Sequence, residues 1–355
     1  MDLPVMPPVE PMLARSAAKV PIGDYLYEPK WDGYRCIVFR DGAEVVLGSR
    51  GGKDLSRYFP ELVESLREAL PERCVVDGEI VVVQDGRLEF DRLSDRIHPA
   101  DSRVRLLAAQ TPASFIGFDL LALGDRDLTG LPFRERRAAL VAALGGSGGP
   151  GEHERVHVTR ITDDDIRAGT WFERFEGAGL DGVVAKPAQG PYTPGERTMV
   201  KVKHERSADV VVAGYRLHKT GRIVGSLMLG LYGADGVLNY VGGASAFTTV
   251  RRRELIDELA PYLLPDGEAH PWVDAAETDE HRRPGTLHRW NAGKDVSFVP
   301  LRPQLVCEVR YDQLQGDRFR HNGRFLRWRP DREPDSCRYD QLEVPAAYDL
   351  GDVLG

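Results

Sequence analysis

The chain has 355 residues, enough for two domains at about 150 residues each. Hydrophobic residues make up 42% of it and charged residues 29%, close to the globular average, which excludes disordered, fibrous and collagen-like proteins. The 47 basic and 55 acidic residues give a net charge of −8, which argues against an indiscriminate nucleic-acid binder, although a local stripe of cations would suffice to bind a phosphate backbone.

The N-terminal part of the chain, up to about residue 205, is expected to mix helices and strands. Its short apolar runs, rich in β-branched and aromatic residues, predict strands, and segments of helical spacing lie between them. The predicted strands are Cys36–Phe39, Val45–Leu47, Cys74–Val83, Ser114–Leu121, Asp181–Lys186 and Met199–Lys203, and the predicted helices are Tyr58–Leu70, Phe133–Leu144 and Asp164–Glu176. Asp41-Gly42 and Asp85-Gly86 predict hairpins. The elements do not alternate regularly, which disfavours a doubly wound parallel sheet.

A second domain is expected after the polar stretch His204–Ser207. The glycine-rich stretch Gly145–Gly151 is interpreted instead as a surface loop of the first domain, because the same strand and helix pattern resumes after it. The predicted strands of the second domain are Val210–Tyr215, Leu227–Tyr232, Val237–Val241 and Leu305–Val309, with a helix around Val250–Leu264. Short strands with one helix suit a small β-barrel of the oligonucleotide-binding (OB) kind, although other small barrels have a similar pattern.

Membrane insertion and structural zinc binding are not expected. No stretch approaches the roughly 20 consecutive apolar residues of a spanning helix, and the first residues carry no signal-peptide pattern, so we expect a soluble, cytoplasmic protein. The four cysteines, Cys36, Cys74, Cys307 and Cys337, form no CxxC pair. Reduced thiols are therefore expected, and not a zinc site.

The densest group of chemically active side chains is Glu28–Arg35, with the sequence EPKWDGYR. Pro29 and Gly33 flank a break between apolar runs, so Lys30 is expected on a turn with its side chain displayed. A lysine amine attacks an electrophile only when deprotonated, which requires desolvation or neighbouring cations. The structural alternative is a solvated lysine in a hairpin.

Further polar groups follow Lys30 in order along the chain. They are Ser49–Lys53, Asp77-Gly78-Glu79, Phe118-Asp119, Asp181–Lys186 and Met199–Lys203. Lys201 and Lys203 share one strand face and can converge on a single anion. Each group also has a structural interpretation, such as a solvated strand face, a core phenylalanine or a turn, and only the ordered series points to a site.

On these residues the sequence resembles the covalent nucleotidyltransferases, which comprise ATP-dependent DNA ligases, RNA ligases and mRNA capping enzymes. It is most similar to the short bacterial ATP-dependent DNA ligases of end joining and repair, from about Glu28 to Arg332. The resemblance implies an α+β fold: an ATP-grasp-like adenylation (nucleotidyltransferase) domain with antiparallel-rich sheets over residues 1–205, then an OB-fold β-barrel over residues 206–355.

The resemblance also implies roles for individual residues, with Lys30 as the nucleophile that becomes bonded to AMP. On the nucleoside, it assigns adenine recognition to Glu28, stacking on the base to Phe118 and the ribose to Glu79. It assigns phosphate contacts to Arg197, Lys201 and Lys203, and contacts with the ribose, the phosphates or the nick to Arg35 and Arg50. Glu79 and Asp181 are assigned to the metal. Two positions depart from the family pattern. Asp181 stands where a glutamate is usual, and Met199 where an aromatic residue often precedes the lysine pair.

Arginines interleaved with aromatic residues crowd the C-terminal part of the chain, a combination suited to phosphate contact and stacking. The resemblance implies that Arg324, Arg327, Arg329 and Arg332 contact DNA or orient the pyrophosphate of ATP in the first chemical step. An arginine-rich barrel surface without such a role is the structural alternative.

The activity implied is a DNA ligase that seals 5′-phosphate/3′-hydroxyl nicks with ATP and Mg²⁺ or Mn²⁺. NAD is disfavoured, because NAD-using ligases carry a nicotinamide-binding module and a four-cysteine zinc finger. The expected partners are nicked or broken duplex DNA and an end-binding or repair polymerase protein, with the chain itself a monomer. An RNA ligase, a capping-type guanylyltransferase and a non-catalytic DNA-end-binding module remain the alternatives.

Overall fold

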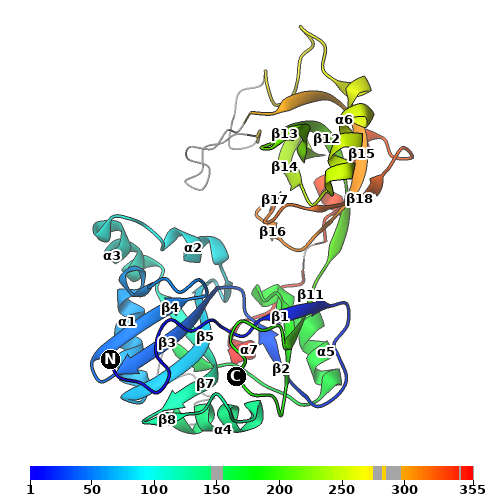
Figure 1. Ribbon diagram of the computed structural model, residues 1–355. Coiled ribbons are helices and arrows are strands. Elements are labelled where there is room, and N and C mark those ends of the chain that lie inside the picture. The colour runs from blue at the N-terminus through cyan, green and yellow to red at the C-terminus, as the bar shows by residue number, and fades with distance from the viewer. Residues whose placement is uncertain (145–154, 275–281, 285–296, 344, 355) are drawn as a thin grey trace. The chain divides into compact units, whose positions relative to one another are not determined.

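The computed structural model describes residues 1–144, 155–274, 282–284, 297–343 and 345–354, so the loop predicted at Gly145–Gly151 lies outside the described residues. The chain divides into two compact units (Figure 1), the first comprising Met1–Lys203 with Pro345–Gly355 and the second His204–Val344. The sequence predicts that all of 206–355 forms the second domain. The C-terminal segment departs from that prediction, because Leu350 and Val353 are buried in the first unit's core.

Two mostly antiparallel sheets form the first unit. The smaller has the order β1 (Ala14–Ala17), β11 (Met199–Lys203), β10 (Gly182–Pro187), β2 (Tyr25–Lys30). The larger has the order β4 (Glu44–Ser49), β3 (Tyr34–Asp41), β5 (Arg73–Gln84), β7 (Ala113–Leu123), β8 (Arg126–Asp127), with β6 (Arg87–Leu88) on β5 and β9 (Val156–Val158) on β7. The parallel pairs among these strands are β1 with β11 and β7 with β9. The predicted hairpin at Asp41-Gly42 joins β3 to β4, where Gly42 has a positive φ of 60°.

Most helices of the first unit lie against these sheets (Figure 1). They are α1 (Pro60–Ala69), α2 (Phe90–Asp95), α3 (Asp101–Gln110), α4 (Phe133–Ala143), α5 (Asp165–Arg174) and α7 (Gly351–Leu354). Pro60 starts α1, since a proline at the first helical position loses no intrahelical hydrogen bond. Asp164 caps α5 by accepting the Ile166 and Arg167 backbone N–H groups.

A five-stranded antiparallel sheet forms the core of the second unit. Its order is β14 (Leu238–Ala244), β13 (Gly221–Tyr232), β12 (Arg206–His218), β15 (Val299–Tyr311), β18 (Arg324–Trp328), with a short hairpin of β16 (Leu314–Gln315) and β17 (Arg318–Phe319) and the helix α6 (Thr249–Leu259). Register shifts interrupt the pairing of β12 with β13 and β15, and such bulges bend a sheet toward a barrel. The predicted strands and helix of this part are confirmed.

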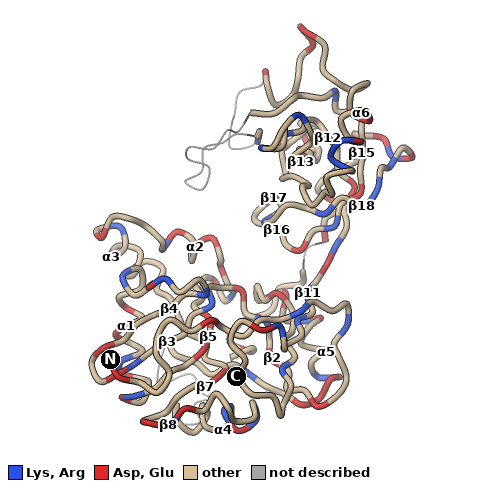
Figure 2. Tube along the Cα trace, viewed as in Figure 1, with Lys and Arg blue, Asp and Glu red and all other residues tan. Residues whose placement is uncertain are grey.

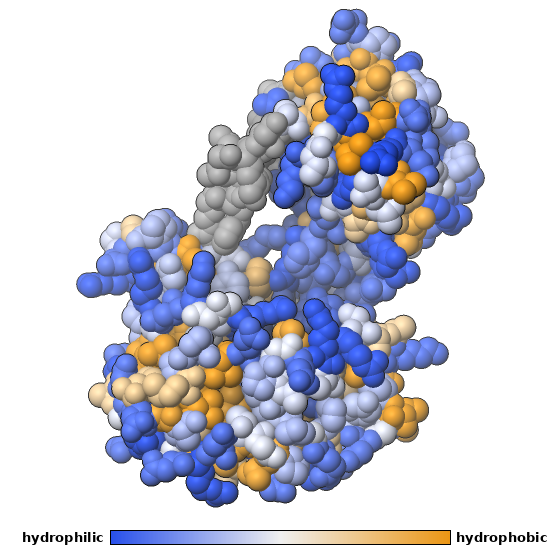
Figure 3. Space-filling view, in the orientation of Figure 1, coloured by the Kyte–Doolittle hydropathy of each residue, from blue (hydrophilic) through white to orange (hydrophobic). Residues whose placement is uncertain are grey.

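Figure 3 shows that the surface of each unit in this view is largely hydrophilic, with hydrophobic residues in scattered patches. Among the described residues, no helix has the length and apolar character needed to cross a membrane. Cys36, Cys74, Cys307 and Cys337 are buried free cysteines.

The C-terminal segment is bound to the first unit by packing and by a backbone hydrogen bond. The Leu350 N–H donates to the Gly86 carbonyl at 2.8 Å, and the Tyr348 ring lies 5.3 Å from that of Phe175. Gly177 has no side chain where the segment passes, and a Cβ there would lie 1.9 Å from the Ala346 oxygen. The turn predicted at Asp85-Gly86 therefore also forms part of a docking surface.

We expect Leu350→Ala to destabilise the first unit by about 2 kcal/mol, the low end of the range for buried leucines, because the segment can detach instead of leaving a cavity. Urea denaturation of the full chain measures this loss. Asp352→Ala, an exposed position in the same segment, is the control and should leave the unfolding midpoint unchanged. Equal midpoints for both variants would show that the segment is not docked in solution.

Candidate active site

A cavity of about 290 Å³ in the first unit is lined by strands of both sheets. Its lining residues are Pro11–Ala14, Glu28–Trp31, Arg35, Arg50, Glu79, Phe118, Val184, Lys186, Arg197, Met199, Lys201 and Lys203. This set contains every residue of the first unit that the sequence analysis assigns to the nucleophile or to nucleotide contacts. Asp181, assigned to the metal, is not among them.

Lys30 is the last residue of β2, so the prediction that it lies on a turn is wrong. Its side chain is 20% exposed and forms an ion pair with Asp181, and Lys203 Nζ lies 3.0 Å from the same carboxylate. Burial acts to raise the pKa of Asp181, but the two lysines outweigh it and hold the pKa below its usual value. Asp181 therefore holds Lys30 at the cavity as a charged pair, and does not itself line the cavity.

The cations on one side of the cavity are close enough to repel one another. Burial lowers the pKa of Lys201, and the charges of Lys203, Lys30, Arg50 and Arg197 lower it further. On β11, Val200 and Val202 are buried while the two lysines are partly exposed, in the alternation that the sequence predicts. Such a cluster is unfavourable alone and favourable around a polyanion. Figure 2 marks the lysines of β11 in blue.

Glu28 and Lys186 form a buried ion pair at the cavity, with Lys186 Nζ 2.7 Å from Glu28 Oε2. Burial raises the pKa of Glu28 and lowers that of Lys186, and the attraction between them opposes both shifts. Glu28 Oε1 is buried without a hydrogen-bond partner among the described residues. The sequence analysis missed Lys186 as a site residue. Lys186 lies two residues after Val184 on β10, so both side chains point to the same face of the strand, and both line the cavity.

Two cations contact the ring of Phe118, a residue of the cavity lining. The Arg35 guanidinium is 4.4 Å and Lys186 Nζ 4.3 Å from the centre of its ring. Arg35 is held from behind by two 2.6 Å hydrogen bonds to Asp77, which also accepts the Tyr192 hydroxyl at 2.7 Å. Asp77 is fully buried, and its contacts orient Arg35.

The predicted arginines of the second unit are largely paired with carboxylates. Arg327 donates to Glu308 at 2.7 Å, and Arg329 donates to both Asp209 and Asp331. Arg324 is exposed on β18. Figure 2 marks these positions in blue. The sequence analysis missed Asp209, which stands alone among apolar residues on β12.

Comparison with known proteins decides the family. The family model described as ATP dependent DNA ligase domain matches residues 11–203, and that of the ATP dependent DNA ligase C terminal region matches residues 220–332. The chain belongs to the ATP-dependent DNA ligases. The predicted resemblance, fold class and ligase activity are confirmed, and the ligase uses ATP.

Individual relatives agree with this assignment. The ligase is 57% identical to DNA ligase C of Mycobacterium tuberculosis over 100% of its own length and 99% of the relative. It is 30% identical to the multifunctional non-homologous end joining DNA repair protein LigD of that organism, over 91% of its own length and 39% of the relative. A solved structure from a study of Lig E DNA ligases has the same fold, with a TM-score of 0.55 and 16% identity, and covers 90% of the ligase and 99% of that chain.

Glu79 makes the stability of the ligand-free ligase depend on pH. Burial raises the pKa of its carboxyl from 4.5 to about 7, although Arg35 and Lys30 oppose the shift. The folded-state pKa lies above the unfolded one, so this group's stabilising contribution is complete below pH 4.5 and is lost as the pH rises through 7. At about 1.4 kcal/mol for each pKa unit, the loss amounts to at most about 3.5 kcal/mol.

We therefore expect Glu79→Gln to become progressively more stable than the unmodified chain between pH 5 and pH 8. Urea denaturation at a series of pH values, without nucleotide or metal, measures the difference. A constant difference across that range would contradict the raised pKa. Glu68→Gln, at an exposed position on α1, is the matched control.

Proposed function

We propose that the ligase seals 5′-phosphate/3′-hydroxyl nicks in duplex DNA in three steps. Lys30 first gives up its ammonium proton, and the amine nitrogen then attacks the α-phosphorus of ATP. A phosphorus–nitrogen bond forms, the phosphorus–oxygen bond to pyrophosphate breaks, pyrophosphate leaves with the bonding electron pair, and the nitrogen releases a second proton to solvent. AMP then passes from Lys30 to the 5′-phosphate of the nick. The 3′-hydroxyl finally attacks that phosphate, and AMP leaves with the bonding electron pair. The observation that carries this proposal is the position of Lys30 on a cavity lined by several cations.

The cavity offers each part of ATP a complementary group. Glu28 Oε1, buried without a partner among the described residues, would accept a hydrogen bond from the amino group of adenine, and Phe118 would stack on the base. Glu79 would bind the ribose hydroxyls. The phosphates would lie among Arg50, Arg197, Lys201 and Lys203, with Arg35 contacting the ribose or a phosphate. Phosphoryl transfer depends mainly on such positioning and charge stabilisation.

Mg²⁺ or Mn²⁺ is proposed as the metal. The described residues contain no cluster of three or more His, Cys, Asp and Glu side chains. Magnesium in nucleotide sites needs only one or two carboxylates besides the substrate phosphates. Glu79, which lines the cavity, and Asp181, which contacts the cavity residues Lys30 and Lys203, are the carboxylates proposed to hold it. Bound there, the metal would neutralise charge that develops on the phosphates. In the structure Lys30 and Lys203 are ion-paired with the Asp181 carboxylate. With the metal bound to Asp181, the two lysine side chains would contact the phosphates instead.

The second unit is proposed to bind DNA through Arg324, Arg327, Arg329 and Arg332, which would also help to orient the pyrophosphate. Binding that rests on phosphate contacts weakens steeply with salt. A partner that holds DNA ends, such as an end-binding protein or a repair polymerase, would compensate for this. The relationship to LigD supports a role in repair by end joining. We propose that the ligase acts in the cytoplasm as a monomer.

Mass spectrometry after incubation with ATP and Mg²⁺ tests the proposal. We expect one added AMP, located on Lys30 by peptide mapping, and its loss on addition of nicked DNA. Incubation with labelled GTP, and with broken RNA in place of DNA, tests the capping and RNA-ligase alternatives. An unmodified chain, or AMP on another lysine, would contradict the proposed mechanism, and DNA-end binding without AMP transfer would support a non-catalytic module.

A further inference from the structure

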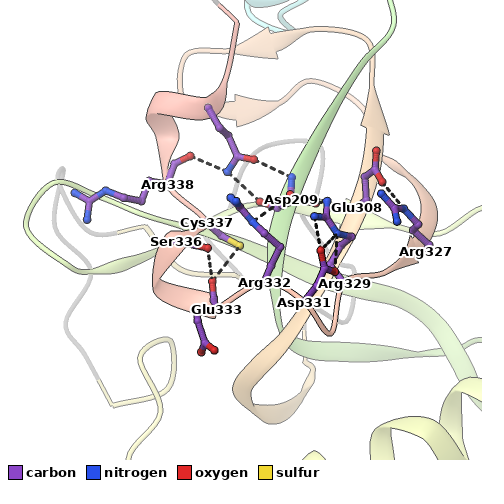
Figure 4. A network of polar contacts seen from close by, with 11 residues as sticks. Asp209, Glu308, Arg327, Arg329, Asp331, Arg332, Glu333, Ser336, Cys337 and Arg338 are labelled. Atoms are coloured by element: carbon purple, nitrogen blue, oxygen red, sulfur yellow. Dashed lines mark hydrogen bonds and ion pairs between the residues drawn. The ribbon is translucent and has the colours of Figure 1, made fainter.

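A cluster of charged side chains in the second unit is centred on Asp209, a residue of β12 (Figure 4). Both carboxylate oxygens of Asp209 accept from Arg329 Nη1, at 2.8 and 2.9 Å. Arg332 Nε lies 3.4 Å from the same carboxylate. One acidic side chain therefore contacts two arginines of the C-terminal group to which the proposed function gives a role in the first chemical step.

Hydrogen bonds from all three guanidinium nitrogens fix the orientation of the Arg329 side chain. Nη1 donates to Asp209, while Nε and Nη2 donate to Asp331 at 2.8 to 3.2 Å. A guanidinium group presents its donors in a rigid plane, so two carboxylates at different edges leave it one orientation. The Asp209 and Arg329 side chains are only 13% and 18% exposed, so solvent screens this pair less than a pair on the open surface.

Asp209 itself is held by contacts to its backbone. The Gln341 side-chain amide accepts from the Asp209 N–H at 2.8 Å and donates to the Asp209 carbonyl at 3.0 Å. The same amide donates to the Arg338 carbonyl at 2.8 Å. Gln341 lies far from β12 in sequence, so this contact fixes the strand end that carries Asp209 against the segment that follows the arginine group.

We propose that Asp209 is a positioning residue for the adenylation of Lys30, acting through Arg329 and Arg332, and that Gln341 fixes Asp209. This inference rests on the proposed role of those arginines in orienting pyrophosphate. An arginine displaced by about 1 Å can lower the rate of a step about 100-fold. The later steps form and use adenylated DNA after pyrophosphate has left, and need no such orientation.

Asp209→Asn keeps the shape of the side chain and removes its charge. We expect the rate of AMP transfer to Lys30 to fall about tenfold to a hundredfold, while the rate of sealing a nick that already carries AMP, measured at saturating DNA so that weaker DNA binding has no effect, changes less than about threefold. A loss of stability alone would slow both reactions together. The matched control is Glu254→Gln, which removes a carboxylate 3.1 Å from Arg251 in the same unit and should leave both rates unchanged.

Two further variants keep the inference testable if Asp209→Asn folds poorly. Gln341→Met leaves the carboxylate in place but frees the Asp209 backbone, and we expect a smaller loss confined to the same step. Adding Asp209→Asn to the double variant Arg329→Ala with Arg332→Ala should slow AMP transfer no further, because Asp209 acts through these two arginines.

The outcomes distinguish the inference from the function on which it rests. If Arg329→Ala and Arg332→Ala both leave AMP transfer at its normal rate, the proposed role of the arginines is wrong. If either slows AMP transfer but Asp209→Asn and Gln341→Met do not, the arginines act without Asp209 and the inference is wrong. Equal losses in AMP transfer and in sealing of adenylated nicks would also overturn it.

Discussion

Replacing Lys30 by alanine is expected to abolish labelling of the protein by ATP that carries ³²P in its α-phosphate, with a loss of about 10⁴-fold or more, as for removal of other catalytic nucleophiles. Lys30 is the nucleophile proposed here, and its side chain lines the cavity while paired with Asp181. We do not expect the neighbouring Lys201 and Lys203 to replace it, because the proposed function assigns their charges to the phosphates and both belong to another strand, β11.

Two controls separate loss of the nucleophile from loss of the fold. Lys19→Ala, an exposed position on the same unit, should be labelled at the normal rate. Lys30→Ala should still join a nick that already carries AMP, since the last step requires no bond to lysine. A variant that is labelled normally would show that AMP is bonded elsewhere, and one that fails in every reaction and melts early would indicate a structural lysine.

Local sequence patterns were sufficient for much of the fold. The apolar runs that form β3, β5, β7 and β11 are buried on at least one face, and this burial explains why their sequences are apolar enough to be recognised as strands. The pattern failed at β2, whose six residues include Glu28, Pro29 and Lys30. These residues line the cavity, and polar groups required at a site interrupt the apolar signal of a strand.

The candidate site was predictable where each motif contributes a side chain directly to the cavity, as with Glu79 and Lys201. It was not predictable where a residue acts through another. Tyr192, which donates to the carboxylate behind Arg35, lies in a loop outside every motif. Asp209 belongs to a largely apolar strand and is distant in sequence from the arginines that it contacts in space. Only the tertiary structure brings such pairs together.

Asp119, the residue after Phe118 in the chain, is buried, and its carboxylate is paired with the guanidinium of Arg136. Arg136 of α4 donates to its two oxygens at 2.8 and 2.9 Å, and also to the backbone carbonyls of Leu131 and Gly190. Arg136 is 1% exposed. Arg136 therefore links β7, α4 and the loop at Gly190. Removing one partner of a buried ion pair leaves an uncompensated buried charge, which costs far more than an unpaired charge at the surface.

We expect Arg136→Met, which nearly keeps the volume but removes the charge, to destabilise the first unit by about 3–5 kcal/mol, measured by urea denaturation. Arg134→Met on the same helix breaks only an exposed pair, 3.6 Å from Asp24, and should cost less than about 1 kcal/mol. Adding Asp119→Leu to Arg136→Met should restore part of the loss, since no unpaired carboxylate then remains buried. If the double variant is less stable than Arg136→Met alone, Asp119 stabilises the fold through contacts other than this pair.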